Sequence, residues 1–411
     1  MYTEKSFVLD DKADSRSEPV TVVVPKPKNG EAAQYRIPFN RPGLVGHELT
    51  YIADAILKGH SAGDGTYTKR CHRFLEKELG AAKVLLTTSC THALELAALL
   101  LSIQPGDEVV VPSFTFVSTI NAFVLRGATP VFVDVRPDTL NMDEALLPAA
   151  ITTRTKAILP VHYAGVGCEM DFICETARRK GIPVVEDNAH GLFGRYKGKL
   201  LGTFGALATQ SFHETKNVIC GEGGALVVND PSFSERAEII REKGTDRARF
   251  YRGQVDKYTW VDVGSSYLPS DLLAAFLLAQ LEKYHSIRET RRRVWHSYEG
   301  GLRRWAQKNQ VALPIVPPHC EQSYHMFYML MPSLRARQGL IAHLKRRGIL
   351  AVFHYVPLHL SAMGLKFGYK PGDCPVTEDA SDRLIRLPFF NDLSEEQQCE
   401  VIETVTQFEA H

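Results

Sequence analysis

One lysine, Lys216, stands in the stretch GALATQSFHETKNVICGEGGALVV, which runs from residue 205 to residue 228. A strand-like run ending near Ser211 precedes it, and glycines at 221, 223 and 224 follow it. Glycine lets a backbone approach a ligand closely or adopt positive φ. A lysine in a confined site can have a lowered pKa and act as a Schiff-base nucleophile. The alternative is a solvated lysine in a surface loop.

Three small residues, Ser89, Cys90 and Thr91, lie between a strand-like run and the helical stretch ALELAALLL. A helix N-terminus offers unpaired N–H groups and a partial positive charge, which suit a phosphate group. The alternative is that Ser89 or Thr91 only caps the helix.

Two further segments place chemical groups after strand-like runs. In PVVEDNAHG, Asp187 ends a run and His190 follows, so the carboxylate could anchor a ligand cation or pair with a neighbouring arginine. In VVVPSFTFVST, Phe114 or Phe116 could stack on a planar ring or be part of the core.

Together these segments supply an amine, a carboxylate, an aromatic face and a phosphate cradle. Pyridoxal phosphate requires all four: a lysine for its aldehyde, an anion for its ring nitrogen, an apolar face, and N–H and hydroxyl donors for its phosphate. The combination therefore predicts a pyridoxal-phosphate site.

The elements that position these residues alternate between short β-rich runs and helical segments. Runs such as DEVVVP and PVFVDV are continuously apolar, which is typical of parallel strands buried on both faces. Amphipathic helices are expected near 44–58 and 69–80. Ligands bind at the carboxyl ends of strands in such sheets, where the candidate residues lie.

Changes in composition and in the pattern of strand-like and helical segments divide the chain into three parts. Residues 1–36 are predicted to be a polar tail, residues 37–270 a large α/β domain that binds the cofactor, and residues 271–411 a long helix with a smaller C-terminal α/β domain.

Composition excludes several classes of function. With 48 basic and 47 acidic residues the formal net charge is +1, which argues against nucleic acid or an anionic membrane as the main partner. The eight cysteines form no CxxC pair, as in reduced cytoplasmic proteins. No secretory signal and no apolar run of membrane-spanning length is found, so we expect a cytoplasmic protein.

The motifs GDGTYTKRCHRFLEKELG, TSCTHALELAALLL, VEDNAHG, SFHETKN, GEGGA and FHYVPLH, in this order, resemble the DegT-type sugar-nucleotide aminotransferases. The resemblance covers roughly residues 37 to 408. It implies fold type I of the pyridoxal-phosphate-dependent transferases, with a central, mostly parallel seven-stranded sheet between helices. It also implies a homodimer whose active sites are shared across the interface.

The resemblance also implies roles for single residues. Lys216 would bond to the cofactor aldehyde and Asp187 would pair with the ring nitrogen. His190 would lie near the ring hydroxyl, and Phe116 would stack on the ring. The residues expected around the phosphate are Ser89, Cys90, Thr91 and Ser211.

Two positions depart from the family pattern. Cys90 replaces a common glycine, where a backbone N–H can still serve. Ser266 stands in GSSYL where many members carry an asparagine that the neighbouring subunit donates to the phosphate, and its hydroxyl can still donate.

By the same resemblance, a set of residues would bind the sugar nucleotide: Asp64, Gly65, His325, His354, Tyr355 and His359. We expect no metal site, because His354 and His359 have no third ligand near them in the sequence.

The expected reaction moves the amino group of L-glutamate to the C4 keto group of a dTDP-4-keto-6-deoxyhexose, giving dTDP-4-amino-4,6-dideoxy-D-galactose. Lys216 would act as base and acid. The alternatives are the equatorial (gluco) product, a 3-keto or UDP-linked sugar, and a protein of this fold that has lost its chemistry. A dehydratase is disfavoured because such members commonly replace the lysine with histidine.

Overall fold

The computed structural model describes residues 3–6, 21–24 and 35–410. Strands β1 (Thr3–Ser6) and β2 (Thr21–Val24) pair antiparallel. Most of the remaining segment 1–36 lies outside the described residues, so the polar tail stays a prediction.

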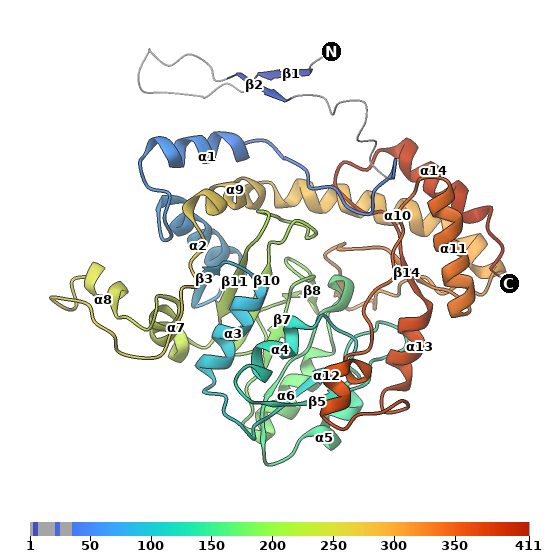
Figure 1. Ribbon diagram of the computed structural model, residues 1–411. Helices are drawn as coiled ribbons and strands as arrows, with labels where there is room; N and C mark the ends of the chain where they lie inside the picture. Colours follow the sequence, from blue (N-terminus) through green and yellow to red (C-terminus); the bar gives the residue numbers. More distant parts are fainter. Residues whose placement is uncertain (1–2, 7–20, 25–34, 411) are drawn as a thin grey trace.

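Within residues 35–410, seven strands form one sheet at the centre of the molecule (Figure 1). Two parallel bridges, Ile158–Val184 and Val161–Asp187, join its four-stranded and three-stranded parts. Only β11 runs antiparallel to its neighbours. This arrangement confirms the expected mostly parallel sheet. The strand order is β3 (Lys83–Thr87), β11 (Gly224–Val228), β10 (Leu207–Ser211), β7 (Val185–Asp187), β6 (Thr155–Ile158), β4 (Glu108–Pro112) and β5 (Thr129–Val133).

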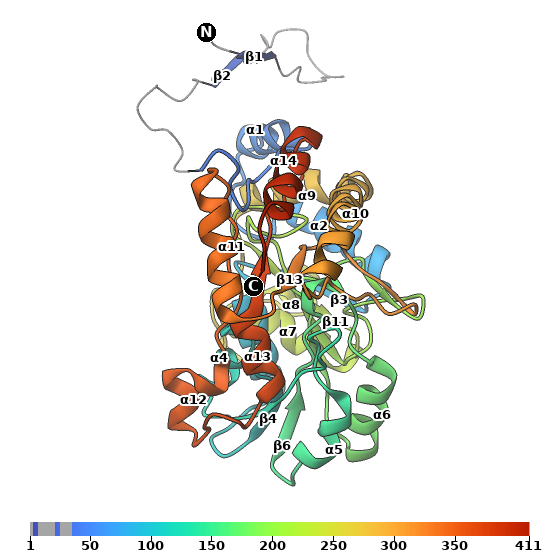
Figure 2. The ribbon, with the colours of Figure 1, turned by 90° about the vertical axis from the view of Figure 1, so that its right-hand side faces the viewer.

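Helices cover both faces of this sheet (Figure 1, Figure 2). Successive strand residues point to opposite faces, so Leu85 and Leu226 pack with one group of helices while Leu86 and Val227 pack with another. The first group is α3 (Cys90–Leu100), α4 (Ser118–Val124) and α7 (Ser234–Arg241). The opposite face is covered by α1 (Glu48–Leu57), α2 (Thr66–Leu79), α9 (Asp271–Glu282), α5 (Leu147–Ala150) and α6 (Met170–Lys180).

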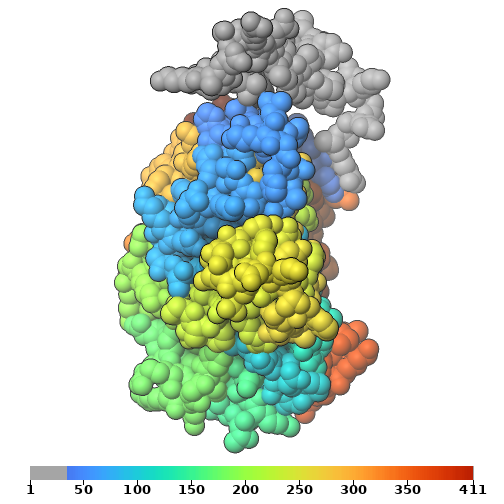
Figure 3. All heavy atoms as spheres, turned by 90° about the vertical axis from the view of Figure 1, so that its left-hand side faces the viewer, coloured from blue at the N-terminus to red at the C-terminus, as the bar shows by residue number. Residues whose placement is uncertain are grey.

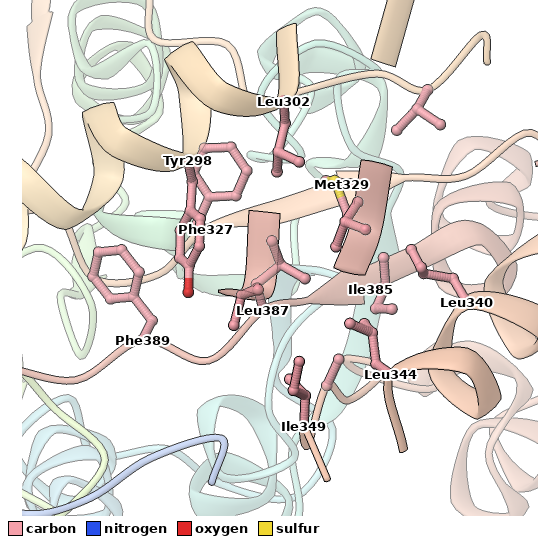
Figure 4. Close-up of a cluster of buried hydrophobic side chains, with 14 of the residues drawn as sticks. Tyr298, Leu302, Phe327, Met329, Leu340, Leu344, Ile349, Ile385, Leu387 and Phe389 are labelled. Carbon is pink, nitrogen blue, oxygen red and sulfur yellow. The ribbon is translucent and has the colours of Figure 1, made fainter. Parts of the chain in front are cut away.

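Helix α10 (Tyr284–Lys308) carries the chain to a second hydrophobic cluster. Figure 4 shows Tyr298 and Leu302 of this helix facing Phe327, Met329 and other buried side chains. The elements around it are β13 (Tyr328–Leu330), β14 (Leu384–Arg386), α11 (Leu334–Arg346) and α14 (Glu395–Thr406). Helix α13 (Pro375–Arg383) packs against α11. Because α9 packs with α1 and α2, the domain boundary at residue 270 stays a prediction.

The remaining elements are short. They are β8 (Arg195–Tyr196), β9 (Lys199–Leu200), α8 (Arg247–Tyr251), β12 (Cys320–Glu321) and α12 (Ala362–Lys366). No helix within residues 35–410 is both long enough and apolar enough to cross a membrane. All eight cysteines are free thiols.

The start of α2 differs from the expected range 69–80. The helix begins at Thr66 because the carboxylate of Asp271 accepts hydrogen bonds from the backbone N–H groups of Tyr67 and Thr68, at 3.1 and 2.7 Å. These amides would otherwise lack partners at the helix N-terminus. A residue about two hundred positions away in the chain therefore fixes this helix end.

Candidate active site

A cavity of about 790 Å³ opens at the carboxyl ends of the parallel strands. Residues from β7, β10, the N-terminus of α3 and the C-terminal part of the chain line it. The structure brings eleven of the predicted residues to this cavity: Ser89, Cys90, Thr91, Phe116, Asp187, His190, Ser211, Lys216, His325, His354 and Tyr355.

Lys216 lies in the connection between the antiparallel strands β10 and β11. Its backbone N–H donates to the carbonyl of His213 at 2.9 Å, and the N–H of Phe212 donates to the carbonyl of Gly223 at 2.8 Å. Burial lowers the pKa of the Lys216 amine from 10.5 to about 8, and the negative charge of Asp187 opposes this shift only in part. The unprotonated share of this amine near neutral pH is therefore far larger than for an exposed lysine, and this is the form that acts as a nucleophile.

Of the glycines that follow the lysine, Gly224 has a clear structural reason. A Cβ at this position would lie 2.4 Å from the backbone nitrogen of Cys90, so β11 approaches the start of α3 more closely than any side chain allows. The glycine thereby sets the amine-bearing loop beside the helix N-terminus.

At that N-terminus the capping interpretation holds. The hydroxyl of Ser89 accepts a hydrogen bond from the N–H of His92 at 3.1 Å, and Thr91 donates to the hydroxyl of Ser118 at 2.9 Å. Capping does not exclude the second role, because a hydroxyl that accepts can still donate. Burial raises the pKa of the Cys90 thiol, which therefore stays protonated and uncharged.

Asp187 ends β7 with its side chain in the cavity. Its Oδ2 accepts from the hydroxyl of Thr119 at 2.7 Å, and its Oδ1 accepts from the N–H of Ala189 at 3.1 Å. Within residues 35–410 it forms no ion pair with an arginine or lysine. A buried carboxylate with this arrangement can receive a ligand cation.

Three histidines form one wall of the cavity. The rings of His190 and His325 stack with centroids 4.2 Å apart and planes inclined by 18°, and His354 lies 6.2 Å from His190. Nδ1 of His325 is 3.0 Å from Oδ1 of Asn217. Burial lowers the pKa of all three imidazoles, and the positive charges of Lys216 and Arg386 act in the same direction. The wall is therefore polar but uncharged at neutral pH.

Only one of the two candidate aromatic residues faces the cavity. Phe114 is buried, whereas Phe116 is 57% exposed and lines the cavity. The ring of Tyr355 lies 6.3 Å from that of Phe116. Phe116 thus offers a free apolar face to a planar ligand.

Four predicted residues lie away from this cavity. Asp64 forms an ion pair with Arg241 at 2.8 Å, and Gly65 precedes α2, where a Cβ would collide with Asp271. His359 is fully buried, with Nδ1 2.6 Å from the Ser113 hydroxyl and Nε2 3.1 Å from Glu378. Ser266 is exposed on the surface. Among the described residues, no group of three or more His, Cys, Asp or Glu side chains could hold a metal ion.

The structure adds residues that sequence reasoning missed. Thr119 orients Asp187, Asn217 contacts His325, and Arg386 brings a second cation to the cavity beside Lys216. Only Arg386 had a usable signal: it is a charged residue inside the apolar run LIRLPFF, between fully buried Ile385 and Leu387.

The chain matches known proteins over nearly its whole length. The model of the DegT/DnrJ/EryC1/StrS aminotransferase family matches residues 45–406. The uncharacterized protein MJ1066 of Methanocaldococcus jannaschii is 33% identical over 376 residues, covering 90% of this chain and 96% of that protein. The spore coat polysaccharide biosynthesis protein SpsC of Bacillus subtilis is 31% identical over 377 residues, covering 90% and 96%.

Solved structures agree with this assignment. The putative sugar aminotransferase Spr1654 from Streptococcus pneumoniae in its PMP form has a TM-score of 0.84 at 29% identity, covering 90% of this chain and 98% of that one. The same protein has also been solved in a PLP form. DesV of S. venezuelae, in complex with a ketimine intermediate, has a TM-score of 0.82 at 31% identity, covering 92% and 99%.

The residues present fit pyridoxal phosphate. An amine of lowered pKa, a carboxylate without an ion-pair partner and a helix N-terminus with hydroxyl groups share one cavity. In addition, Nδ1 of His190 is buried without a hydrogen-bond partner in the described chain, as expected for an atom that faces a bound polar group. The chain is therefore a pyridoxal-phosphate-dependent aminotransferase that belongs to the DegT/DnrJ/EryC1/StrS family.

Proposed function

We propose that the protein transfers the amino group of L-glutamate to the C4 keto group of a dTDP-4-keto-6-deoxyhexose, with dTDP-4-amino-4,6-dideoxy-D-galactose as the product. The observation that carries the proposal is the placement of Lys216 and Asp187 in one cavity of about 790 Å³. This volume lies within the range of pockets that hold cofactors and drug-sized ligands. The sugar in the names of Spr1654 and the polysaccharide in that of SpsC support a sugar acceptor.

Each residue in the cavity has a distinct proposed role. Lys216 would hold the cofactor through its aldehyde, and its amine would carry the proton to and from the carbon that bears the nitrogen. Asp187 stabilises the protonated ring nitrogen, and Phe116 covers one face of the ring. When bound, the cofactor supplies the electron sink for that proton transfer. The phosphate of the cofactor would be held by Ser89, Cys90, Thr91 and Ser211.

The neutral wall of His190, His325 and His354 suits an uncharged sugar. Imidazoles that carry no charge can each donate one hydrogen bond and accept another, which matches hydroxyl and keto oxygens. We propose that His325, His354 and Tyr355 face the sugar. Three predicted residues lie outside the cavity and would contact substrate only after a change in conformation or in the active site of a partner subunit: Asp64, Gly65 and His359.

We also propose a homodimer in which Ser266 of one subunit reaches the phosphate site of its partner. Figure 3 shows the surface formed by α8 and the segment after it, next to α2. This surface exposes large apolar side chains, with Tyr251 70% exposed and Trp260 75% exposed. An exposed apolar patch of this kind is typical of protein–protein interfaces. Light scattering that compares the molecular mass of Trp260→Asp with that of the unsubstituted protein tests this interface. We expect a dimer for the unsubstituted protein and a monomer for the variant, and a dimeric variant would contradict the interface.

The test of the reaction uses the purified protein with pyridoxal phosphate, L-glutamate and a panel of dTDP- and UDP-linked 3-keto and 4-keto sugars. Analysis of the products by NMR identifies the acceptor and the configuration at C4. We expect an axial amine at C4 of the dTDP sugar and none with Lys216→Ala. An equatorial amine or an amine on another sugar would replace the proposed product, and no amine on any sugar would refute the proposal.

A further inference from the structure

Arg386 ends strand β14 and lines the same cavity as Lys216. Its Nε and Nη2 donate to the carbonyl oxygen of Phe353, at 3.3 and 3.0 Å. The guanidinium carbon lies 4.7 Å from the centroid of the Phe39 ring, a cation–π contact. These contacts hold the group in one position, while Nη1 donates to no acceptor in the described chain. The site therefore presents a fixed guanidinium edge to the cavity.

This guanidinium lacks an anionic partner within residues 35–410. The cavity contains two carboxylates, of which Asp187 is held by Thr119 and Glu222 lies 3.6 Å from His213. Burial lowers the pKa of Arg386, and only the phenols of Tyr163 and Tyr355 oppose that effect. Arg386 is partly buried, and a partly desolvated charge without an anionic partner is unfavourable in the free protein.

A bound anion would supply the missing partner. Arginine is suited to this because its planar fork pairs with a carboxylate through two parallel hydrogen bonds. The cofactor phosphate has its own proposed donors at the N-terminus of α3. Two anions remain: the carboxylate of the amino-acid donor and the diphosphate of the sugar nucleotide.

We propose that Arg386 binds a carboxylate of the amino-acid donor, an inference that rests on the proposed use of an amino acid such as L-glutamate. The amine of the donor reacts where Lys216 is bonded, and its α-carboxylate is attached to the reacting carbon. The diphosphate of a nucleotide sugar is separated from C4 by the sugar ring. Arg386 and Lys216 line the same cavity, so one donor molecule can meet both groups. The anion nearest to the reacting nitrogen is thus a carboxylate.

The test is calorimetric titration of the cofactor-loaded protein with glutarate, a dicarboxylate that has no amine and cannot react. In Arg386→Gln, we expect affinity for glutarate to fall by about tenfold to a hundredfold, the effect of losing a hydrogen-bonded charge pair. The glutarate affinity of Arg386→Lys, which keeps the charge but loses the planar fork, should lie between that of the unsubstituted protein and that of Arg386→Gln. Arg195→Gln is the matched control, because Arg195 also donates to a carbonyl, that of Gly198, but lies outside the cavity.

A second titration with dTDP distinguishes the two anions. Its affinity should change less than about threefold in Arg386→Gln. Weaker dTDP binding with unchanged glutarate binding would overturn the proposal in favour of the diphosphate. Equal glutarate affinity in the unsubstituted protein and both Arg386 variants would also overturn it. Cofactor absorbance and circular dichroism check that the variants fold. If Arg386→Gln does not fold, the comparison is made with Arg386→Lys alone.

Kinetics give an independent readout. Arg386→Gln should raise KM for L-glutamate more than KM for the keto-sugar acceptor. The glutarate titration does not depend on the acceptor, so a failure to aminate any sugar would refute the proposed function and leave the carboxylate site to be judged by binding alone.

Discussion

The hydroxyl of Thr119 donates a hydrogen bond to Oδ2 of Asp187, with 2.7 Å between the two oxygens. Thr119 belongs to α4 and Asp187 to the end of β7, so the contact joins two separate elements of the large α/β part. The N–H of Ala189 holds the second carboxylate oxygen. The carboxylate is therefore oriented before any ligand binds.

Thr119→Val should weaken retention of pyridoxal phosphate. Valine keeps the shape but removes the donor, and a hydrogen bond to a charged group contributes about 1.5–3 kcal/mol, or roughly tenfold to a hundredfold in affinity. Absorbance titration of the cofactor-free protein measures this. Thr404→Val is the control, because Thr404 is also buried and donates one hydrogen bond, to the backbone carbonyl of Glu400 in α14. Unchanged cofactor affinity in Thr119→Val would contradict the positioning role.

Lys216→Met should stabilise the cofactor-free protein at pH 7. The folded lysine has a pKa of about 8 against 10.5 for a free one, so the unfolded chain binds more protons between these values. Stability therefore rises with pH across this window, and below pH 8 the buried ammonium carries its full penalty. We expect a gain of roughly 1–3 kcal/mol for the variant.

Urea unfolding of both cofactor-free proteins at pH 7 and near pH 10 measures this difference. The advantage of Lys216→Met should shrink as the pH rises, since the wild-type amine then loses its proton. The same advantage at both pH values would show that packing, rather than titration of Lys216, is responsible.

The same lowered pKa predicts how the cofactor is captured. Only the unprotonated amine of Lys216 attacks the aldehyde, so the rate of uptake should increase with pH and level off above about 8. Stopped-flow absorbance of the cofactor-free protein mixed with pyridoxal phosphate gives this profile. A profile that still rises steeply above pH 9 would mean that Lys216 titrates like an exposed lysine.

Asp64→Asn should destabilise the protein without a direct effect in the cavity. Burial disfavours the Asp64 carboxylate, but the attraction of Arg241 outweighs this and holds its pKa below the ordinary value. Asparagine tolerates the positive φ of 61° at this position but leaves the buried guanidinium unpaired. Because Asp64 is 43% exposed, we expect a loss of about 1–2 kcal/mol, less than for a fully buried pair.

Urea unfolding of this variant at pH 7 and pH 3 checks the assignment. A carboxylate with a lowered pKa contributes stability above its unfolded value and loses it as pH falls, so the difference should be smaller at pH 3. The exposed pair of Glu175 with Arg178 provides the control, and Glu175→Gln should have an effect near zero. Equal stability of Asp64→Asn and the unsubstituted protein would contradict the structural role.

Local patterns were sufficient where a single segment carries the information. Continuously apolar runs predicted the buried strands, and Val109, Val110 and Val111 of β4 are all fully buried. The position of a residue after such a run predicted the placement of Lys216 and Asp187 at one edge of the sheet, because parallel strands end on the same side. The start of α2 was not predictable in this way, since Asp271 fixes it from elsewhere in the chain.

The sequence by itself determined the chemical groups: an amine, a carboxylate and a helix N-terminus, each recognisable from its own segment. The tertiary structure alone decided what surrounds them. It lowered the pKa of Lys216 by burial, oriented Asp187 with Thr119, and separated the exposed Phe116 from the buried Phe114. It also brought Arg386 into the cavity. Contacts between distant segments, and the burial of single side chains in loops, depend on how the elements pack rather than on a local pattern.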